Sequence, residues 1–217
     1  MAYIKNIGNN IYAFIFDNHY DLGMTFLRYQ EFYESPYSQF YRKQFNLIDY
    51  MEFYAKNQSD SNCFSYPSDY SGYNFPDFIF PEAYPEKENK YDVQMLELYT
   101  QAKIKSRNNK FYIIGCVEGE EDTLIHEIAH ALFYLENEYR KEMGTLIKKI
   151  PNKHYNTFKD ILKENMYRDE VMNDEIQAYL ATGVEPFEED LNRAKFPIKS
   201  NIKRFSKVFA KYYKAND

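Results

Sequence analysis

One stretch, 123–132, constrains the fold of this chain more than any other. It places His126 and His130 four residues apart, with Glu127 directly after the first histidine. On an α-helix, residues four apart lie about 40° from each other on one face, so both imidazoles can reach one metal ion. Glu127 projects about 100° round from His126, close enough to touch a water on that metal. The histidines can act together only if the stretch is helical.

The helix that carries this stretch is apolar over most of its circumference, which predicts that it is mostly buried. Its far side carries Leu124, Ile125, Ile128, Ala131, Leu132 and Leu135. Buried histidines need hydrogen bonds or a metal, and each would cost roughly a few kcal/mol if left bare. A pair of core histidines bonded to neighbours is the structural alternative, but it gives the adjacent Glu127 no purpose. The spacing therefore favours a zinc site.

Length and composition predict one packed domain. The chain has 217 residues, of which 44% are hydrophobic and 19% aromatic, well above the content of a disordered chain. We expect a single domain over 1–217, in which an αβ portion, about 1–90, packs on a metal-site portion, about 91–217. The net charge of -6 argues against nucleic acid as the main partner. The sequence does not indicate the oligomeric state.

The N-terminus lacks the basic region and apolar run of a signal peptide, and no stretch approaches the ~18 apolar residues of a membrane span. We expect a cytoplasmic protein without a membrane span, with export that needs no cleaved signal left open. Cys63 and Cys116 lie far apart and form no C-x-x-C pair, which excludes a zinc ribbon. Both are expected to be small buried side chains.

Strand signals are few. Asn9 and Asn10 separate two short apolar runs, 3–7 and 11–16, which predicts a hairpin. The strongest strand is 111–117, because it is β-branched and aromatic and is bounded by turn residues. A proline-rich connection over 58–90 includes a possible short strand at 78–80. A small mixed or antiparallel sheet follows from these segments.

Helical periodicity covers most of the remaining chain, so the expected fold class is α+β and mostly helical. We place Asp21 as the cap of the first helix and Asp92 at the start of a later one. Beside the helix of the histidines, which begins near 120, the expected helices are 21–34, 47–56, 92–105, 138–150, 152–166, 169–182 and 197–214.

A catalytic zinc ion usually has three protein ligands, so a third ligand must be found. In one arrangement it is a histidine six residues after the second histidine, but here that position is Glu136. On an unbroken helix Glu136 lies about 120° round from His130 and points away from the metal. A glutamate on the helix at 169–182 is the alternative, and Glu170 and Glu175 compete for the role.

Helical projection favours Glu175 over Glu170. Glu175 lies inside the apolar arc of its helix, with Ile176 and Ala178 nearby, whereas Glu170 shares the polar side. A carboxylate in an apolar stripe is costly unless it is paired or bound to metal. A buried ion pair with a Lys or Arg is the structural alternative for Glu175.

Two neighbours of Glu175 are further candidates. Asp174 can hold a metal-bound imidazole in one tautomer, or it can be a solvated surface residue. Tyr179 lies one turn beyond Glu175 on the same face, so its phenol can stabilise an oxyanion. With 23 tyrosines in the chain, core packing is the competing role for Tyr179.

The motif at 126–130 and the downstream segment 174–178 together resemble zincin metallopeptidases of the gluzincin type, although they cover a small part of the chain. The resemblance implies a zincin-like fold in which strand 111–117 leads into the metal helix. That strand would lie at the lip of a cleft, where an extended peptide could add to its edge. It also implies one Zn²⁺ ion as cofactor and a peptide or protein as substrate.

These residues predict a zinc-dependent hydrolase, with peptides as the leading substrate class. His126, His130 and Glu175 would bind the metal, Glu127 would act as general base, and Tyr179 would assist. The alternatives are a zinc hydrolase of non-peptide amides and a non-catalytic binding or regulatory protein. The basic run 195–214 could bind nucleic acid or an acidic membrane, but a solvated helix face is favoured.

Overall fold

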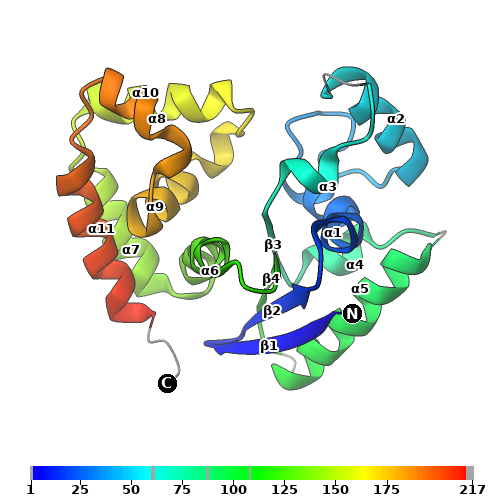
Figure 1. Ribbon diagram of the computed structural model, residues 1–217. Helices are drawn as coiled ribbons and strands as arrows, with labels where there is room; N and C mark the ends of the chain where they lie inside the picture. The colour runs from blue at the N-terminus through cyan, green and yellow to red at the C-terminus, as the bar shows by residue number, and fades with distance from the viewer. Residues whose placement is uncertain (1, 60–61, 87, 108, 214–217) are drawn as a thin grey trace. The chain divides into compact units, whose positions relative to one another are not determined.

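The computed structural model of the chain describes residues 2–59, 62–86, 88–107 and 109–213 (Figure 1). The chain forms two compact units, Met1–Leu124 and Ile125–Asp217. The division falls inside helix α6, Glu121–Leu135. The strand expected to belong with the metal-site portion therefore lies in the first unit, and the single-domain organisation stays a prediction.

The first unit contains a four-stranded sheet. Its strands are β1 Tyr3–Gly8, β2 Ile11–Phe16, β3 Gly72–Pro76 and β4 Tyr112–Val117, in the spatial order β1-β2-β4-β3. The β1–β2 and β3–β4 pairs are antiparallel, and the β2–β4 pair is parallel. The small mixed sheet of the predicted α+β fold is therefore confirmed.

The predicted hairpin joins β1 to β2. Asn9 and Asn10 both adopt left-handed backbone angles, with φ of 50° and 60°. Asparagine tolerates this conformation better than most residues, and positive φ at both central positions produces the tight turn whose twist suits two antiparallel strands.

The predicted strand at 78–80 is wrong, because this segment enters helix α4, Ile79–Ala83. Pro81 lies in the first turn of that helix, where its missing N–H has no intrahelical partner to lose. The strand is instead β3, at the edge of the sheet, where Pro76 is tolerated. The edge backbone N–H of Asn74 is covered by the side chain of Gln30, at 3.1 Å.

Strand β4 lies inside the sheet. Ile113 pairs with Tyr12 of β2 on one side and with Phe75 of β3 on the other. Both edges of β4 are therefore occupied, and the expected addition of a peptide to its edge is wrong. An apolar strand sequence indicates burial, but it does not indicate which strands become its neighbours.

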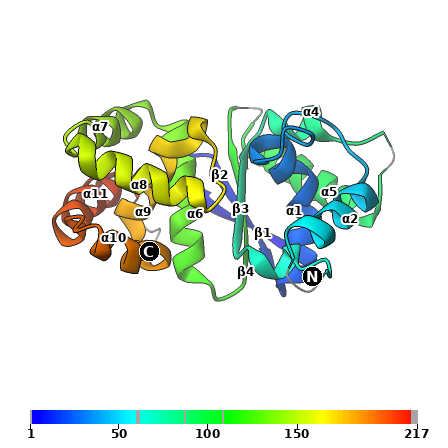
Figure 2. The same ribbon diagram turned by 90° about the horizontal axis from the view of Figure 1, so that it is seen from above.

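Helices α1, α2, α4 and α5 lie on one side of the sheet (Figure 2). The bounds not yet given are α1 His19–Glu34, α2 Leu47–Asn57, α3 Tyr66–Asp69 and α5 Lys90–Lys105. Helix α1 approaches β4 closely at Gly115, where a Cβ atom would lie 2.5 Å from the ring of Phe26. This position therefore excludes any larger residue.

Two helices of the first unit begin earlier than predicted. Asn18 caps α1, because its Oδ1 accepts the backbone N–H of Asp21 at 2.8 Å. Asn89 caps α5 in the same way, and the carboxylate of Asp92 accepts the backbone N–H of Asn89 in return. Each aspartate is thus the third residue of its helix rather than the first, where a carboxylate still complements the helix dipole.

The second unit is helical. Its elements after α6 are α7 Asn137–Ile147, α8 Asn152–Glu164, η1 Asp169–Val171, α9 Met172–Thr182, η2 Glu185–Phe187, α10 Glu188–Arg193 and α11 Ile198–Tyr212. Helix α9 packs against α7, α8 and α11 (Figure 1). Most of its residues are buried, which fits its central place.

The structure also differs from the predictions in several helix bounds and in the exposure of one cysteine. The helix expected over 169–182 begins with the 3₁₀ turn η1, and α10 was not expected. Helix α11 ends at Tyr212, and residue 214 of its expected range lies outside the described residues. Cys116 is buried as expected but Cys63 is exposed, so that prediction is wrong for Cys63. Across the described ranges, every helix is too short or too polar to cross a membrane.

Candidate metal centre

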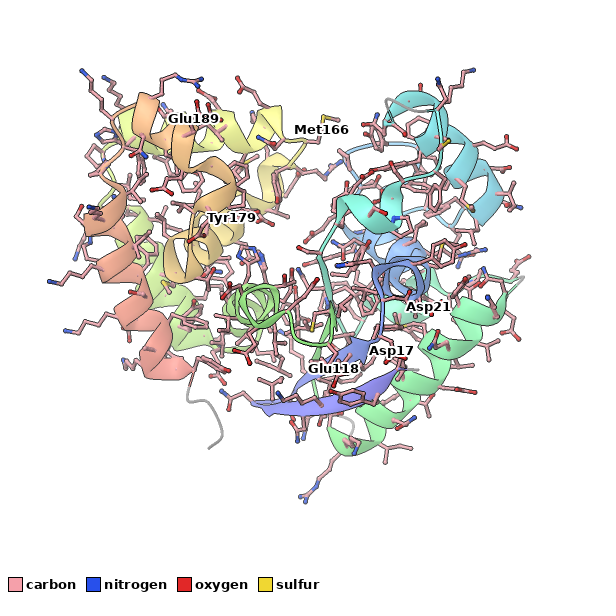
Figure 3. The ribbon with its side chains drawn as sticks, in the orientation of Figure 1. Asp17, Asp21, Glu118, Met166, Tyr179 and Glu189 are labelled. Atoms are coloured by element: carbon pink, nitrogen blue, oxygen red, sulfur yellow. The ribbon has the colours of Figure 1, made fainter. Side chains whose placement is uncertain are left out.

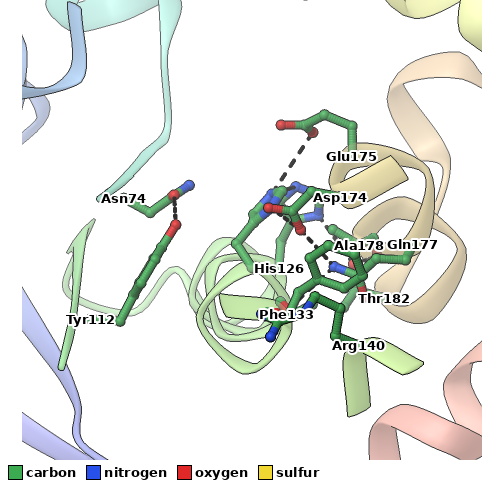
Figure 4. Close-up of polar contacts among 12 residues, drawn as sticks. Asn74, Tyr112, His126, Phe133, Arg140, Asp174, Glu175, Gln177, Ala178 and Thr182 are labelled. Atoms are coloured by element: carbon green, nitrogen blue, oxygen red, sulfur yellow. Dashed lines mark hydrogen bonds and ion pairs between the residues drawn. The ribbon is translucent and has the colours of Figure 1, made fainter. Parts of the chain in front are cut away.

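Helix α6 presents the histidines as predicted. Glu121 and Asp122 lie in its first turn, where negative charge complements the helix dipole. The helix ends at Leu135, and Arg140 Nη1 donates to the carbonyl of Phe133 at 2.8 Å (Figure 4). Between these ends, His130 is 3% exposed.

Three of the predicted residues converge in the second unit (Figure 4). Ligand atoms of His126, His130 and Glu175 all lie within 4.8 Å of one another. The two Nε2 atoms are 3.2 Å apart, and His130 Nε2 lies 3.8 Å from Glu175 Oε2. In a tetrahedral zinc site with bonds of about 2.0–2.1 Å, ligand atoms lie roughly 3.3–3.4 Å apart. The spacing between the two Nε2 atoms is close to this value, whereas the spacing from His130 Nε2 to the Glu175 carboxylate is longer.

The tautomer of His126 follows from its neighbours. The hydroxyl of Thr182 donates its one proton to the carbonyl of Ala178, at 2.8 Å. The same oxygen lies 3.2 Å from His126 Nδ1, so it can only accept there. His126 therefore carries its proton on Nδ1, and its Nε2 presents a lone pair toward His130.

The tautomer of His130 is set by a carboxylate. His130 Nδ1 donates to Asp174 Oδ1 at 3.0 Å, so Nε2 is the nitrogen that faces His126. Gln177 Nε2 donates to the same Asp174 oxygen at 2.9 Å, and Tyr139 Oη donates to Gln177 Oε1 at 2.7 Å. Asp174 is thus held from two sides, so the ring of His130 has little freedom to turn.

In their neutral forms, the two histidines would aim Nε2 lone pairs at each other across 3.2 Å. Two acceptors at this distance repel unless a cation lies between or beside them. The buried carboxylate of Glu175 adds a third acceptor to the same point. A proton or a metal ion is what this arrangement requires, and the neutral imidazoles and carboxylate suit zinc.

Burial and the charges of neighbouring groups shift the pKa values of the three cluster residues. Burial, and then the charge of His130, lower the pKa of His126 well below its ordinary value. Burial also opposes charge on His130, but Asp174 and Glu175 outweigh it and raise the pKa of His130. Burial raises the pKa of Glu175 to about 8, with His130 opposing and Asp174 and Glu127 adding to it. Without a metal, the cluster holds positive charge as protons.

Glu127 and Tyr179, the two residues expected to act on substrate, lie beside the cluster. Glu127 follows His126 on α6 and is 7% exposed. The ring of Tyr179, on α9, lies 4.5 Å from the ring of His126, centroid to centroid (Figure 3). Burial, and then the charge of Glu175, raise the pKa of Tyr179, so its phenol stays protonated at neutral pH.

The rejected candidates lie elsewhere. The side chain of Glu170 is 63% exposed and pairs with Arg168 at 3.4 Å. Glu136 is the residue before α7 and is not part of the cluster. The geometry therefore separates Glu175 from both alternatives.

Sequence reasoning missed Thr182, Gln177 and Tyr167. Thr182 lies seven residues after Glu175, about 20° from it on the same helix face, so helical projection could have found it. Helical projection places Gln177 on the polar side of its helix, with Glu170, although it is fully buried. Tyr167 lies in the turn after α8, where no periodic pattern indicates its direction.

We compared the chain with family models, with curated proteins and with solved structures, and none of the three comparisons gives a match. The chemistry of the site must therefore be inferred from its own residues.

Proposed function

We propose that the second unit binds one zinc ion through His126, His130 and Glu175 and that the protein hydrolyses amide bonds, with peptides as the leading substrate. One observation carries the proposal: the Nε2 atoms of the two histidines lie 3.2 Å apart and converge with the buried Glu175 carboxylate, while both Nδ1 atoms are engaged elsewhere. The fold in this proposal is zincin-like, as the resemblance implies.

A bound zinc ion would supply a water acidified toward neutral pH and would polarise a substrate carbonyl. Glu127 would take one proton from that water as its oxygen bonds to the carbonyl carbon. Glu127 would then deliver the proton to the amide nitrogen as the carbon–nitrogen bond breaks. The second proton of the water passes from the new carboxyl group to the amine, so the products are a carboxylate and an ammonium group, and atoms and charge balance.

Tyr179 would donate a hydrogen bond to the carbonyl oxygen of the substrate. Negative charge develops on that oxygen during attack, and a fixed neutral donor stabilises it. The protonated phenol of Tyr179, packed against His126, suits this role. Glu127 is not needed for holding a metal, so its burial beside the cluster favours catalysis over a purely structural site.

The decisive experiment measures metal content and activity together. Purified protein should contain one zinc per chain by mass spectrometry and should cleave members of a mixed peptide library. Glu127→Gln should keep the zinc and lose turnover by at least about 100-fold, the usual worth of a general base. Full activity in this variant would exclude Glu127 as the base.

The same assay separates the alternatives. Zinc with cleavage of amides but of no peptide would identify a non-peptide amide hydrolase. Zinc with no hydrolysis of either class would identify a binding or regulatory protein. Glu175→Ala should lose zinc, whereas the matched change Glu170→Ala, on an exposed glutamate, should keep it. Unchanged zinc in Glu175→Ala would exclude Glu175 as a ligand.

A further inference from the structure

The hydroxyl of Tyr179 is paired with that of a second tyrosine. Tyr167 Oη and Tyr179 Oη lie 2.8 Å apart, in hydrogen-bond distance. Only one proton can lie between two hydroxyl oxygens, so the other hydroxyl keeps its proton for a third group. This pair was not expected from the sequence, and the role proposed above for Tyr179 does not account for it.

The neighbours of the two rings indicate which hydroxyl donates its proton to the other and which keeps its proton for a third group. The ring of Tyr179 is held between His126, at 4.5 Å, and Phe187, at 4.8 Å between centroids. Tyr179 is also one turn from the proposed ligand Glu175. The ring of Tyr167 contacts that of Tyr179 at 6.5 Å between centroids and has no ring contact with either histidine among the described residues. The outward donor is therefore Tyr179, and Tyr167 donates to it.

Tyr167 is fixed in place by the turn that carries it. Its backbone N–H donates to the carbonyl of Leu162 at 3.1 Å, which closes the end of α8. Met166, just before it, adopts φ of 69°, a left-handed conformation that is strained for methionine. Asp169, just after it, pairs with Lys159 at 3.1 Å and Lys163 at 2.9 Å. The side chain of Met166 itself is exposed (Figure 3).

We propose that Tyr167 is a positioning residue: its hydroxyl donates to Tyr179 Oη and so directs the proton of Tyr179 toward the carbonyl oxygen of the substrate. The chain of donors runs from the turn after α8, through Tyr179, to the oxygen on which charge develops. A donor that is fixed before charge develops needs no reorganisation during the reaction, which is the source of its effect. The inference rests on the proposed amide hydrolysis.

The test removes single oxygen atoms. Tyr167→Phe should keep one zinc per chain and the wild-type KM, but lower kcat about tenfold, the usual net worth of one hydrogen bond. Tyr179→Phe should lower kcat about 100-fold, as for loss of one oxyanion donor. The double variant should be no slower than Tyr179→Phe, because Tyr167 acts only through Tyr179.

Met166→Asn is the matched control in the same turn. Asparagine tolerates positive φ, so this variant should melt a few degrees higher than the wild type while its kcat stays unchanged. A second measurement does not depend on turnover. A peptidyl phosphonate, whose tetrahedral oxygens imitate the charged carbonyl oxygen, should bind Tyr167→Phe about tenfold more weakly by calorimetry.

The outcomes separate this inference from the proposed function. A wild-type protein that binds no zinc, or cleaves no amide, would overturn the proposed function. If the wild type binds zinc and cleaves, but Tyr167→Phe keeps wild-type kcat and phosphonate affinity, the positioning role alone is wrong. Loss of zinc in Tyr167→Phe would also overturn it, because the hydroxyl would then support the metal site rather than Tyr179.

Discussion

At the scale of single residues, one hydroxyl sets the tautomer of a proposed metal ligand. The Thr182 hydroxyl donates to the carbonyl of Ala178, so it can only accept a hydrogen bond from His126 Nδ1. This leaves the Nε2 lone pair of His126 ready for a metal without any rearrangement. Partners of this kind contribute about 10–100-fold to metal affinity in known sites.

Thr182→Val should therefore weaken zinc binding by at least about tenfold. Valine keeps the shape of threonine but leaves His126 Nδ1 without an acceptor, so the other tautomer becomes competitive. Thr182→Ser restores the hydroxyl and should bind zinc like the wild type. Competition with a chromophoric chelator measures both affinities, and equal affinity for the valine variant and the wild type would contradict the role of Thr182.

Glu31, in the first unit, is a buried carboxylate with no assigned function. It is 4% exposed, and its Oε2 has no hydrogen-bond partner among the described residues. Burial raises its pKa above the ordinary 4.5, and the nearby hydroxyls of Ser35, Tyr50 and Tyr66 offset this only in part. Because the folded pKa is raised, the stability that Glu31 contributes is full below about pH 4.5 and is lost as pH rises through the folded pKa.

Glu31→Gln should consequently stabilise the first unit at pH 7 by roughly 1–3 kcal/mol, the cost of an incompletely satisfied buried group. At pH 4 the two proteins should be nearly equal, because Glu31 is then protonated in both the folded and the unfolded chain. Urea unfolding at the two pH values measures the difference. Glu52→Gln, on an exposed position of α2, is the control that should change neither value. A destabilised Glu31→Gln protein at pH 7 would mean that the carboxylate is fully paired.

At the same scale, the sequence predicts the proposed ligands better than their partners. His126 and His130 are rare residues at a helical spacing, and Glu175 is a charged residue in an apolar arc. Each can therefore be identified from the sequence alone. The contacts of Thr182 and Tyr167 depend on where two helices and a turn meet. Helical projection places Thr182 on the face of Glu175, but hydroxyl groups occur throughout this chain and no spacing singles out Tyr167.

At the scale of elements, helix positions are predicted well and helix starts less well. The sequence predicts Asp21 as the cap of its helix and Asp92 as the start of another, although Asn18 and Asn89 are the caps, three residues earlier in each case. Asparagine and aspartate both suit a cap, so the sequence alone leaves two starts open. Strand neighbours are harder still, because β3 contains Asn74 and Pro76 and its pairing with β4 is a long-range contact.

Helix α11 carries lysines at every fourth position on its exposed face. Lys199, Lys203 and Lys207 are all exposed, and no acidic residue lies on the helix. Its apolar residues, including Phe205 and Phe209, are buried within the second unit. Lysines four apart repel one another by about 0.2–0.5 kcal/mol per pair.

Lys203→Glu should stabilise the second unit by about 0.8–2 kcal/mol, because it replaces two repulsive pairs with two attractive ones. Lys203→Gln, which only removes charge, should give about half of that gain. Unfolding by urea at low ionic strength measures both, and 1 M salt should erase the difference. A solvated helix face behaves in this way; salt-dependent binding of DNA or anionic lipid vesicles that Lys203→Glu abolishes would instead indicate a surface selected for a polyanion.

At the scale of the whole molecule, the described polar contacts of the proposed metal centre lie in one unit. His126, His130 and Glu175, with their partners Asp174 and Thr182, belong to the second unit. A metal that binds only the folded state stabilises it by about 2.7 kcal/mol at 100 times its dissociation constant. That stabilisation should be local to the helices that supply the ligands.

Removal of zinc by a chelator should therefore raise hydrogen exchange in α6 from Ile125 onward and in α9, while the strands of the first unit keep their protection. The physical reason is that the freed histidines and carboxylates regain hydration and repel one another, which lowers the free energy needed to open these two helices. Exchange measured by mass spectrometry with and without chelator, and again after zinc is restored, tests this directly. The Glu175→Ala protein is the control, because it should exchange like the chelated wild type whether or not zinc is added. An equal rise in exchange in β2 and β4 would show that the two units open as one cooperative body, and the single domain expected from the sequence would then describe the chain better than two units do.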